Sequence, residues 1–226
     1  MPSPHRLVGG HHRRLCERKE VARLGPSDLG FCRCFPSPHS VLPVVGPRLR
    51  RHVMPMLFSL HGRPKEAYFQ TRFTVLREPL GMPLGSERLA DDGDAVHAWI
   101  EVDGLVVAVG RAHIIPEGSD GSGADHKGPG AARIPPFGPL ADRSARRPAF
   151  QIRQMGTLPA HQRKGYAADV LGELERIMSE EFGCKTGLLQ ARQHAIPFYE
   201  SQGWALIDEP YTIGVIGPHR SMVKRF

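Results

Sequence analysis

The stretch from Gln162 to Ala167 has the composition of an anion-binding loop. It places two cations, Arg163 and Lys164, and a glycine, Gly165, directly before a predicted helix. The first N–H groups of a helix have no partner inside it, and most helices begin at a Ser, Thr, Asp or Asn cap. No such cap stands here, so free N–H groups, the positive end of the helix dipole and two cations suit a phosphate. A glycine-tipped turn with solvated charges is the alternative.

Elements on both sides must position this loop. Residues 150–158 before it predict a strand. Residues 165–182 after it predict a helix, because apolar residues recur there at helical spacing: Tyr166, Val170, Leu171, Leu174, Ile177, Met178 and Phe182. Gly183 follows at the position where a left-handed residue commonly ends a helix. A short strand at 186–190 and a short helix at 194–202, ending at Gly203, complete a strand–helix–strand–helix unit.

Two motifs in this unit resemble those of the GCN5-related N-acetyltransferase (GNAT) family. The family's pyrophosphate loop, Gln/Arg-x-x-Gly-x-Gly/Ala, is similar to Gln162-x-x-Gly165-x-Ala167. Its second signature, which lines the coenzyme A arm, is similar to Ala195-x-x-Phe198-Tyr199-Glu200-x-x-Gly203-Trp204. The resemblance covers roughly residues 64–226. It departs from the family at Arg192, where an Asn is frequent, which leaves the polar contact made from that position undefined.

The resemblance implies a role for each part of the two motifs. The backbone of Met155, Gly156 and Thr157 would pair with the pantetheine arm and the acyl carbonyl of acetyl-CoA. The loop would hold the pyrophosphate through Gln162, Arg163, Lys164, Gly165, Tyr166 and Ala167, and the coenzyme A arm would lie along Ala195 and Phe198. Tyr199 would give a proton to the leaving thiolate. A buried aromatic on a core-facing helix is the other interpretation of Tyr199.

The general base and the acceptor contacts are predicted from single residues. His97 lies in a strand expected to edge the cleft, and a histidine with a pKa of about 6.5 suits deprotonation of an amine. A histidine satisfied in the core or at the surface is the alternative. Glu78, Arg153 and His219 are polar residues in otherwise apolar stretches and are candidates for acceptor binding. Serine-hydrolase, zinc-protease and Walker signatures are absent, which excludes those enzyme classes.

The first half of the domain predicts a strand, a helix and a hairpin. Residues 54–60 predict a short strand, residues 64–79 a helix, and residues 86–94 a short helix and turn. Residues 95–102 and 105–115 alternate around Asp103-Gly104, a two-residue hairpin signal. Gly110 and Arg111 interrupt the second of these strands, which indicates a close approach or a bulge.

Residues 116–148 form a long insertion of Gly, Pro and small polar residues, which we expect to be flexible. Within it, residues 134–140 are apolar enough to fold back onto the domain as a lid. The last stretch, residues 204–226, predicts two strands around Gly217-Pro218-His219.

The net charge of +7 lies entirely in residues 1–55, which hold ten Lys or Arg and three acidic residues. The rest of the chain is neutral, so its charge does not support nucleic-acid binding. Residues 1–55 lack periodicity, which predicts a disordered tail, or a translated leader before a start at Met54 or Met56. Cys32-x-Cys34 fits no usual zinc spacing, and we expect no metal.

The sequence also limits the compartment. Four cysteines provide no disulfide framework for a chain of this size, which favours a reducing compartment. No apolar run could span a membrane, and no signal peptide is evident. We therefore expect a cytoplasmic protein without membrane or nucleic-acid partners.

Together these features predict a single α/β domain at residues 56–226, with a mixed, mainly antiparallel sheet that is splayed at its centre and flanked by helices. The resemblance implies an enzyme that transfers an acetyl group from acetyl-CoA directly to a primary amine of a small molecule or peptide. An acyl-CoA-binding regulatory module without turnover is the alternative, and a nucleic-acid binder that acts through the basic tail is a third hypothesis. The sequence does not identify the acceptor, and it leaves a homodimer open.

Overall fold

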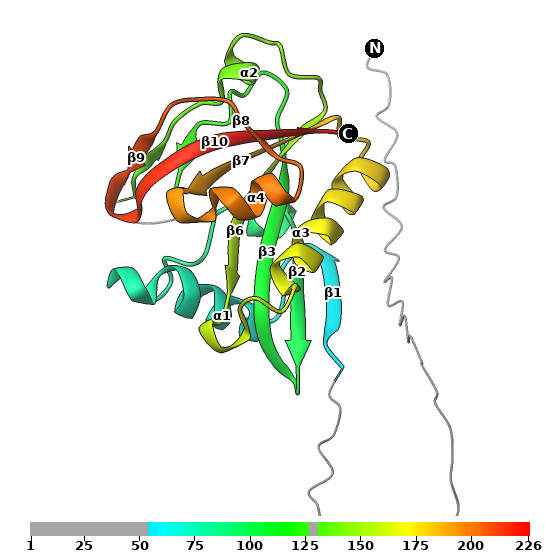
Figure 1. Ribbon diagram of the computed structural model, residues 1–226, viewed down its shortest axis with the longest axis vertical. Coiled ribbons are helices and arrows are strands. Elements are labelled where there is room, and N and C mark those ends of the chain that lie inside the picture. Colours follow the sequence, from blue (N-terminus) through cyan, green and yellow to red (C-terminus); the bar gives the residue numbers. More distant parts are fainter. Residues whose placement is uncertain (1–53, 127–130) are drawn as a thin grey trace, which may run out of the picture. The chain divides into compact units, whose positions relative to one another are not determined.

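The computed structural model describes residues 54–126 and 131–226, so the predictions for the basic tail lie outside the described residues. The helices and strands follow one another along the chain (Figure 1) as β1 (Met56–His61), α1 (Glu66–Leu76), β2 (Val96–Val102), β3 (Leu105–Ile115), β4 (Gly123–Ala124), β5 (Arg133–Ile134), α2 (Gly138–Ala141), β6 (Ala149–Thr157), α3 (Tyr166–Arg176), β7 (Thr186–Arg192), α4 (Ile196–Ser201), β8 (Ala205–Leu206), β9 (Tyr211–Ile213) and β10 (Gly217–Arg225).

One mixed sheet forms the centre of the domain. Its strands lie in the order β1-β2-β3-β6-β7-β10-β8, and β9 pairs with β10. The pair β6–β7 is parallel and the other pairs are antiparallel. The sheet confirms the predicted mixed, mainly antiparallel architecture.

Helices cover both faces of this sheet because its strands alternate between two apolar clusters. On β2, Ala98 and Ile100 join the cluster that contains Leu171 and Leu174 of α3. Trp99, between them, joins the cluster of Tyr68 and Phe69 on α1, as well as Val106 and Val109. Successive side chains of a strand point to opposite faces. Helices α1 and α3 therefore cover opposite faces.

A bulge in β6 separates the two parallel strands at the centre of the sheet. Val109 pairs with Gly156 and Arg111 with Arg153, so Gly110 alone faces two residues of β6. Gln154, one of those two, has a φ of 57°. The ladder between β6 and β7 ends at the pair Ile152 and Leu189. Beyond that pair the two strands diverge, because an extra residue bends and twists the bulged strand.

Gly110 makes room for this bulge. A Cβ atom at Gly110 would collide with the sulfur of Met155 and would lie 2.8 Å from Cγ1 of Val170. The predicted close approach and the predicted bulge at Gly110 are both confirmed, although the extra residue is in β6 and not in β3. The Asp103-Gly104 hairpin is confirmed as well, with φ angles of 54° and 77°.

Some element boundaries differ from the predictions. Helix α1 ends at Leu76, and the predicted single helix at 165–182 is α3 followed by a π-helical turn at Ile177–Glu181. Gly183 has a φ of 65°, as predicted for the residue that ends this segment. The turn of the last hairpin is Gly214–Ile216, and the predicted turn at residues 217–219 is instead the start of β10.

Part of the insertion folds back onto the sheet, as predicted. Phe137 and Leu140 are buried in one cluster with Ile115 and Leu188. Residues 127–130 of the insertion lie outside the described residues.

Candidate active site

A cleft of about 840 Å³, called the central cleft below, opens where β6 and β7 diverge. Residues of α1, β6, β7, α3, α4, β9 and β10 contribute to its walls. Thirteen of the residues predicted to form the site line it: Arg153, Met155, Gly156, Thr157, Gln162, Arg163, Gly165, Tyr166, Ala167, Ala195, Phe198, Tyr199 and His219. The splay of the sheet therefore brings two motifs that are distant in the sequence to one cavity.

One end of the central cleft, the α3 end, is built from backbone groups. Helix α3 begins at Gly165 without a side-chain cap, and Gly165 has a φ of 86°. The N–H groups of Ala168 and Asp169 donate to the Gly165 carbonyl. No described residue accepts a hydrogen bond from the N–H groups of Tyr166 and Ala167. These free donors at a helix start suit an anion.

The two cations of the loop are placed differently. The backbone of Arg163 has a φ of 58°, and Arg163 lines the central cleft. Lys164 is exposed and does not line it. Of the two predicted phosphate-binding cations, the structure therefore places only Arg163 on the cleft, and a contact of Lys164 with the pyrophosphate stays a prediction.

The middle of the cleft is the edge of β6 beyond its bulge. Met155, Gly156 and Thr157 line it. A Cβ atom at Gly156 would lie 2.9 Å from Cγ1 of Val75, so α1 packs directly against this backbone. The Thr157 hydroxyl is buried without a hydrogen-bond partner. The parallel ladder has ended before these residues, so the edge that faces β7 can pair with a ligand.

Tyr199 projects from α4 into the same cleft. Its side chain is 7% exposed, and its ring packs against Phe198 and Trp204 at centroid distances of 5.0 and 6.3 Å. Among the described residues none hydrogen-bonds its hydroxyl. Burial raises the pKa of the phenol well above 10.0, and the charge of Arg192 opposes this shift. Tyr199 is therefore both a packed aromatic and a protonated group on the cleft.

The opposite end, the β10 end, contains His219. His219 is 5% exposed, and its Nδ1–H donates to the Gly217 carbonyl over 2.8 Å. Burial lowers its pKa below 6.5; the Gly217 hydrogen bond counteracts this shift and the charge of Arg192 adds to it. The ring is therefore neutral at pH 7. With the proton on Nδ1, the lone pair is on Nε2, which no described residue binds.

Four charged residues complete the β10 end: Arg77, Asp125, Arg153 and Arg192. Of these, only Arg153 was a predicted site residue, and Arg192 was noted as a departure from the family. Arg77 is the neighbour of the predicted Glu78, which is exposed and does not line the cleft. Asp125 belongs to the insertion, where no motif marks it.

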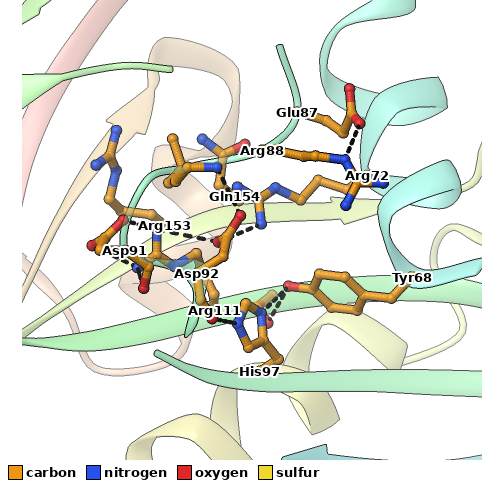
Figure 2. A network of polar contacts seen from close by, with 12 residues as sticks. Tyr68, Arg72, Glu87, Arg88, Asp91, Asp92, His97, Arg111, Arg153 and Gln154 are labelled. Carbon is orange, nitrogen blue, oxygen red and sulfur yellow. Dashed lines mark hydrogen bonds and ion pairs between the residues drawn. The ribbon is translucent and has the colours of Figure 1, made fainter. Parts of the chain in front are cut away.

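His97 does not line the central cleft. The residue is fully buried, its Nε2 lies 2.9 Å from the Asp92 carbonyl oxygen, and its Nδ1 lies 3.1 Å from the Tyr68 hydroxyl (Figure 2). Burial lowers its pKa to about 4. Both ring nitrogens are engaged inside the core, so the structure contradicts the assignment of His97 as the general base.

His97 belongs instead to a buried ionic network that sequence reasoning missed (Figure 2). The Arg111 guanidinium makes two contacts with the Asp91 carboxylate, at 3.0 and 2.8 Å. Arg72 donates to Asp92 over 3.0 Å. Burial disfavours ionisation of Asp91, but Arg111 outweighs it and holds the pKa of this carboxyl well below 3.8. The network anchors the segment after α1 to β2 and β3.

Several solved structures have a fold similar to that of this chain. An acyl-CoA N-acyltransferase from Pseudomonas aeruginosa has 16% identity and a TM-score of 0.53, over 76% of this chain and 99% of that chain. Arabidopsis thaliana NAA60, in complex with a bisubstrate analogue, has 14% identity and a TM-score of 0.52, over 75% of this chain and 98% of that chain. Escherichia coli ElaA has 19% identity and a TM-score of 0.54, over 76% of this chain and 100% of that chain. At these identities the likeness shows the fold.

The described residues lack the features of a membrane-spanning segment and of a metal site. No helix in the two described ranges is long and apolar enough to cross a membrane. Within the same ranges no group of three or more His, Cys, Asp or Glu residues could hold a metal ion.

The profile of the acetyltransferase (GNAT) family matches residues 55–204, which include both motifs and most of the central cleft. The protein belongs to the acetyltransferase (GNAT) family and is an acyl-CoA-dependent N-acyltransferase.

Proposed function

We propose that the protein transfers an acetyl group from acetyl-CoA to a primary amine by direct attack. The observation that carries this proposal is one cleft that joins an uncapped helix start, a free strand edge and a protonated phenol. These are the groups that hold a pyrophosphate, orient a thioester and protonate a thiolate. Acetyl-CoA fits this donor set, because the free N–H groups of Tyr166 and Ala167 and the Arg163 side chain can neutralise its phosphates.

Each residue has a definite role in the proposed reaction. The backbone of Met155, Gly156 and Thr157 orients the pantetheine arm and donates to the acyl oxygen. The amine nitrogen forms a bond with the acyl carbon as the carbon–sulfur bond breaks. Tyr199 supplies the proton that the departing sulfur takes up.

We propose His219 as the group that receives the amine proton. Its neutral ring lines the cleft and keeps the Nε2 lone pair free, whereas both nitrogens of His97 are engaged elsewhere. A histidine with a lowered pKa is unprotonated at neutral pH, as a base must be. The proton lost by the amine goes to His219, and the proton gained by the thiolate comes from Tyr199, so protons balance over the step.

Release of free thiol from acetyl-CoA tests the proposal. The full chain is mixed with acetyl-CoA and with amines of several classes: amino acids, polyamines, peptides and simple alkylamines. We expect steady thiol release that depends on one of these classes. Tight binding of acetyl-CoA without release from any amine would instead support a regulatory module without turnover.

A further inference from the structure

The charged groups at the β10 end of the central cleft are mostly cations. Arg77, Arg153 and Arg192 contribute guanidinium groups there. Asp125 is the only acid among the described residues that line the cleft. Apolar side chains also line the cleft, among them Ile134 and, from β9 and the turn before β10, Ile213 and Ile216.

The protein only partly compensates the charges of Arg77 and Arg153. Nη2 of Arg77 donates to the Asp125 carbonyl oxygen over 3.0 Å, and Nη1 lies 3.9 Å from the Asp125 carboxylate. Nε of Arg77 is buried without a partner. Arg153 donates to the carbonyl oxygens of Ala124 and Asp125 over 2.8 and 3.2 Å. Both carbonyl oxygens bind Nη2 of Arg153, and no described carboxylate forms an ion pair with its guanidinium.

Arg192 has even less compensation. It is half-buried, and no hydrogen bond or ion pair links its guanidinium to any described residue. A cation withdrawn from water without a partner costs free energy, which an anionic ligand would recover.

The surroundings of Arg192 indicate which ligand that is. Arg192 is the direct partner of His219 across the ladder between β7 and β10. Its charge lowers the pKa values of Arg77 and His219, so the guanidinium is near both. Arg163 belongs to the α3 end, where the pyrophosphate is proposed to bind. The position of Arg192 therefore favours a contact with the acceptor over one with a phosphate of coenzyme A.

We infer that the acceptor is an amine that also carries a carboxylate, which Arg192 and Arg153 bind at the β10 end. The inference rests on the proposed function and specifies its substrate class. An amino acid with an apolar side chain has the required parts, because that side chain can rest on Ile134, Ile213 and Ile216. A polyamine would be repelled by three guanidinium groups. The same cations favour the unprotonated form of the attacking amine, since a nearby positive charge lowers an amine's pKa.

Matched acids and amides test this inference. Thiol release from acetyl-CoA is measured with L-leucine and L-leucinamide, with L-phenylalanine and L-phenylalaninamide, and with spermidine and O-phosphoethanolamine. We expect kcat/KM for each acid to exceed that for its amide at least about tenfold, the scale of one charge-assisted hydrogen bond. The intrinsic reactivity of the amines favours the amides, because the amine of an amino acid amide has a lower pKa than that of the acid and is more often unprotonated. A preference for the acid therefore has to come from the protein.

Two variants distinguish recognition of the carboxylate by Arg192 from a general effect of the protein's net charge. Arg192→Gln should reduce the ratio of acid to amide to near one. Arg225→Gln removes the same charge from the exposed far end of β10, and should leave that ratio as in the wild type. Coenzyme A affinity, measured by calorimetry, should be the same in both variants, and thermal unfolding checks that both are folded.

Four results would overturn the inference. If the amides or spermidine react as well as the acids, the inferred carboxylate site is wrong, while the proposed acetyl transfer stands. A preference for O-phosphoethanolamine over every acid would indicate that the site binds a phosphate and not a carboxylate. Loss of coenzyme A affinity in Arg192→Gln would indicate that Arg192 binds the acetyl donor and not the acceptor. Absence of release with all six compounds also contradicts the inference, and release with other amines then decides whether acetyl transfer itself stands.

Discussion

His219 and Arg192 are paired residues on adjacent antiparallel strands, and both line the central cleft. Directly paired residues of two strands project to the same face of a sheet. The imidazole that we propose as the base therefore lies beside a cation that disfavours its protonation. Burial is the larger cause of the lowered pKa of His219, and Arg192 adds to it.

The first prediction concerns pH. As the pH falls through the lowered pKa of His219, the base becomes protonated and kcat/KM should decrease. Removal of the neighbouring cation in Arg192→Gln should raise the pKa of His219, so the acid limb of the profile should move to higher pH. His219→Gln should lower kcat about 100-fold or more and abolish that limb. An acid limb at the same pH in wild type and Arg192→Gln would contradict this coupling.

The second prediction concerns the phenol of Tyr199. Tyr199→Phe keeps the ring that packs on Phe198 and Trp204 and removes only the hydroxyl, which has no partner among the described residues. We expect kcat to fall about 100-fold and the KM for acetyl-CoA to change little, because the lost interaction acts in the transition state. The melting temperature should stay within about 2 °C of the wild type. Wild-type kcat in the Phe variant would remove Tyr199 from the mechanism.

The third prediction compares two adjacent cations. Arg163 lines the cleft and Lys164 does not, although both precede α3. By calorimetry, Arg163→Gln should weaken coenzyme A binding by about 1 kcal/mol, and Lys164→Gln by less than about 0.5 kcal/mol. Gly165→Glu, which adds a negative charge at the helix start, should weaken it by about 2 kcal/mol or more. Equal losses in the two Gln variants would show that only net charge matters.

The fourth prediction concerns the buried ionic network. Arg111 is fully buried and contacts both Asp91 and Asp92. Arg111→Met removes one partner and leaves the buried Asp92 with less compensation, which should lower the free energy of unfolding by about 3 kcal/mol. Urea denaturation measures this loss, and Arg225→Met serves as the exposed control with an expected change below about 0.5 kcal/mol. A loss below about 1 kcal/mol would mean that the network contributes little to stability.

The fifth prediction concerns the boundary of the domain, which we place near residue 56. Strand β1 begins at Met56 and pairs along β2 from Glu101 to Val96. A chain that starts at Met54 should therefore keep the unfolding temperature and the coenzyme A affinity of the full chain. An insoluble product, or one that does not bind coenzyme A, would show that the preceding residues contribute to the domain.

Sequence reasoning located the parts of the site that depend on local pattern. The helical spacing of Val170, Leu171 and Leu174 predicted α3, and all three are buried. The loop before α3 and the motif on α4 were predicted to meet, and residues of both line one cleft. Each motif depends on residues that are close in sequence, so its own spacing is informative, whereas the meeting of the two motifs was implied by the family resemblance.

The predictions and the structure differ where the direction of a side chain decides which residue lines the cleft. Glu78 and Lys164 were predicted on the site, yet their neighbours Arg77 and Arg163 line it. A shift of one residue changes the direction in which a side chain points, and in a turn the sequence does not indicate which of two adjacent side chains faces the cleft. The role of His97 depends on Asp92 and Tyr68, which lie in other elements, so the strand pattern could not reveal that both its nitrogens are bonded.

The opening beside β6 depends on how many residues that strand contains, more than on which ones they are. Gln154 and Met155 together face Gly110, and the parallel ladder stops just before them. Substitution of Met155 would change the lining of the opening, whereas deletion of one residue there would bring β6 back into register with β3. The parallel ladder could then continue past Ile152 and close the space that a ligand needs. Insertions and deletions in β6 should therefore be tolerated far less than substitutions.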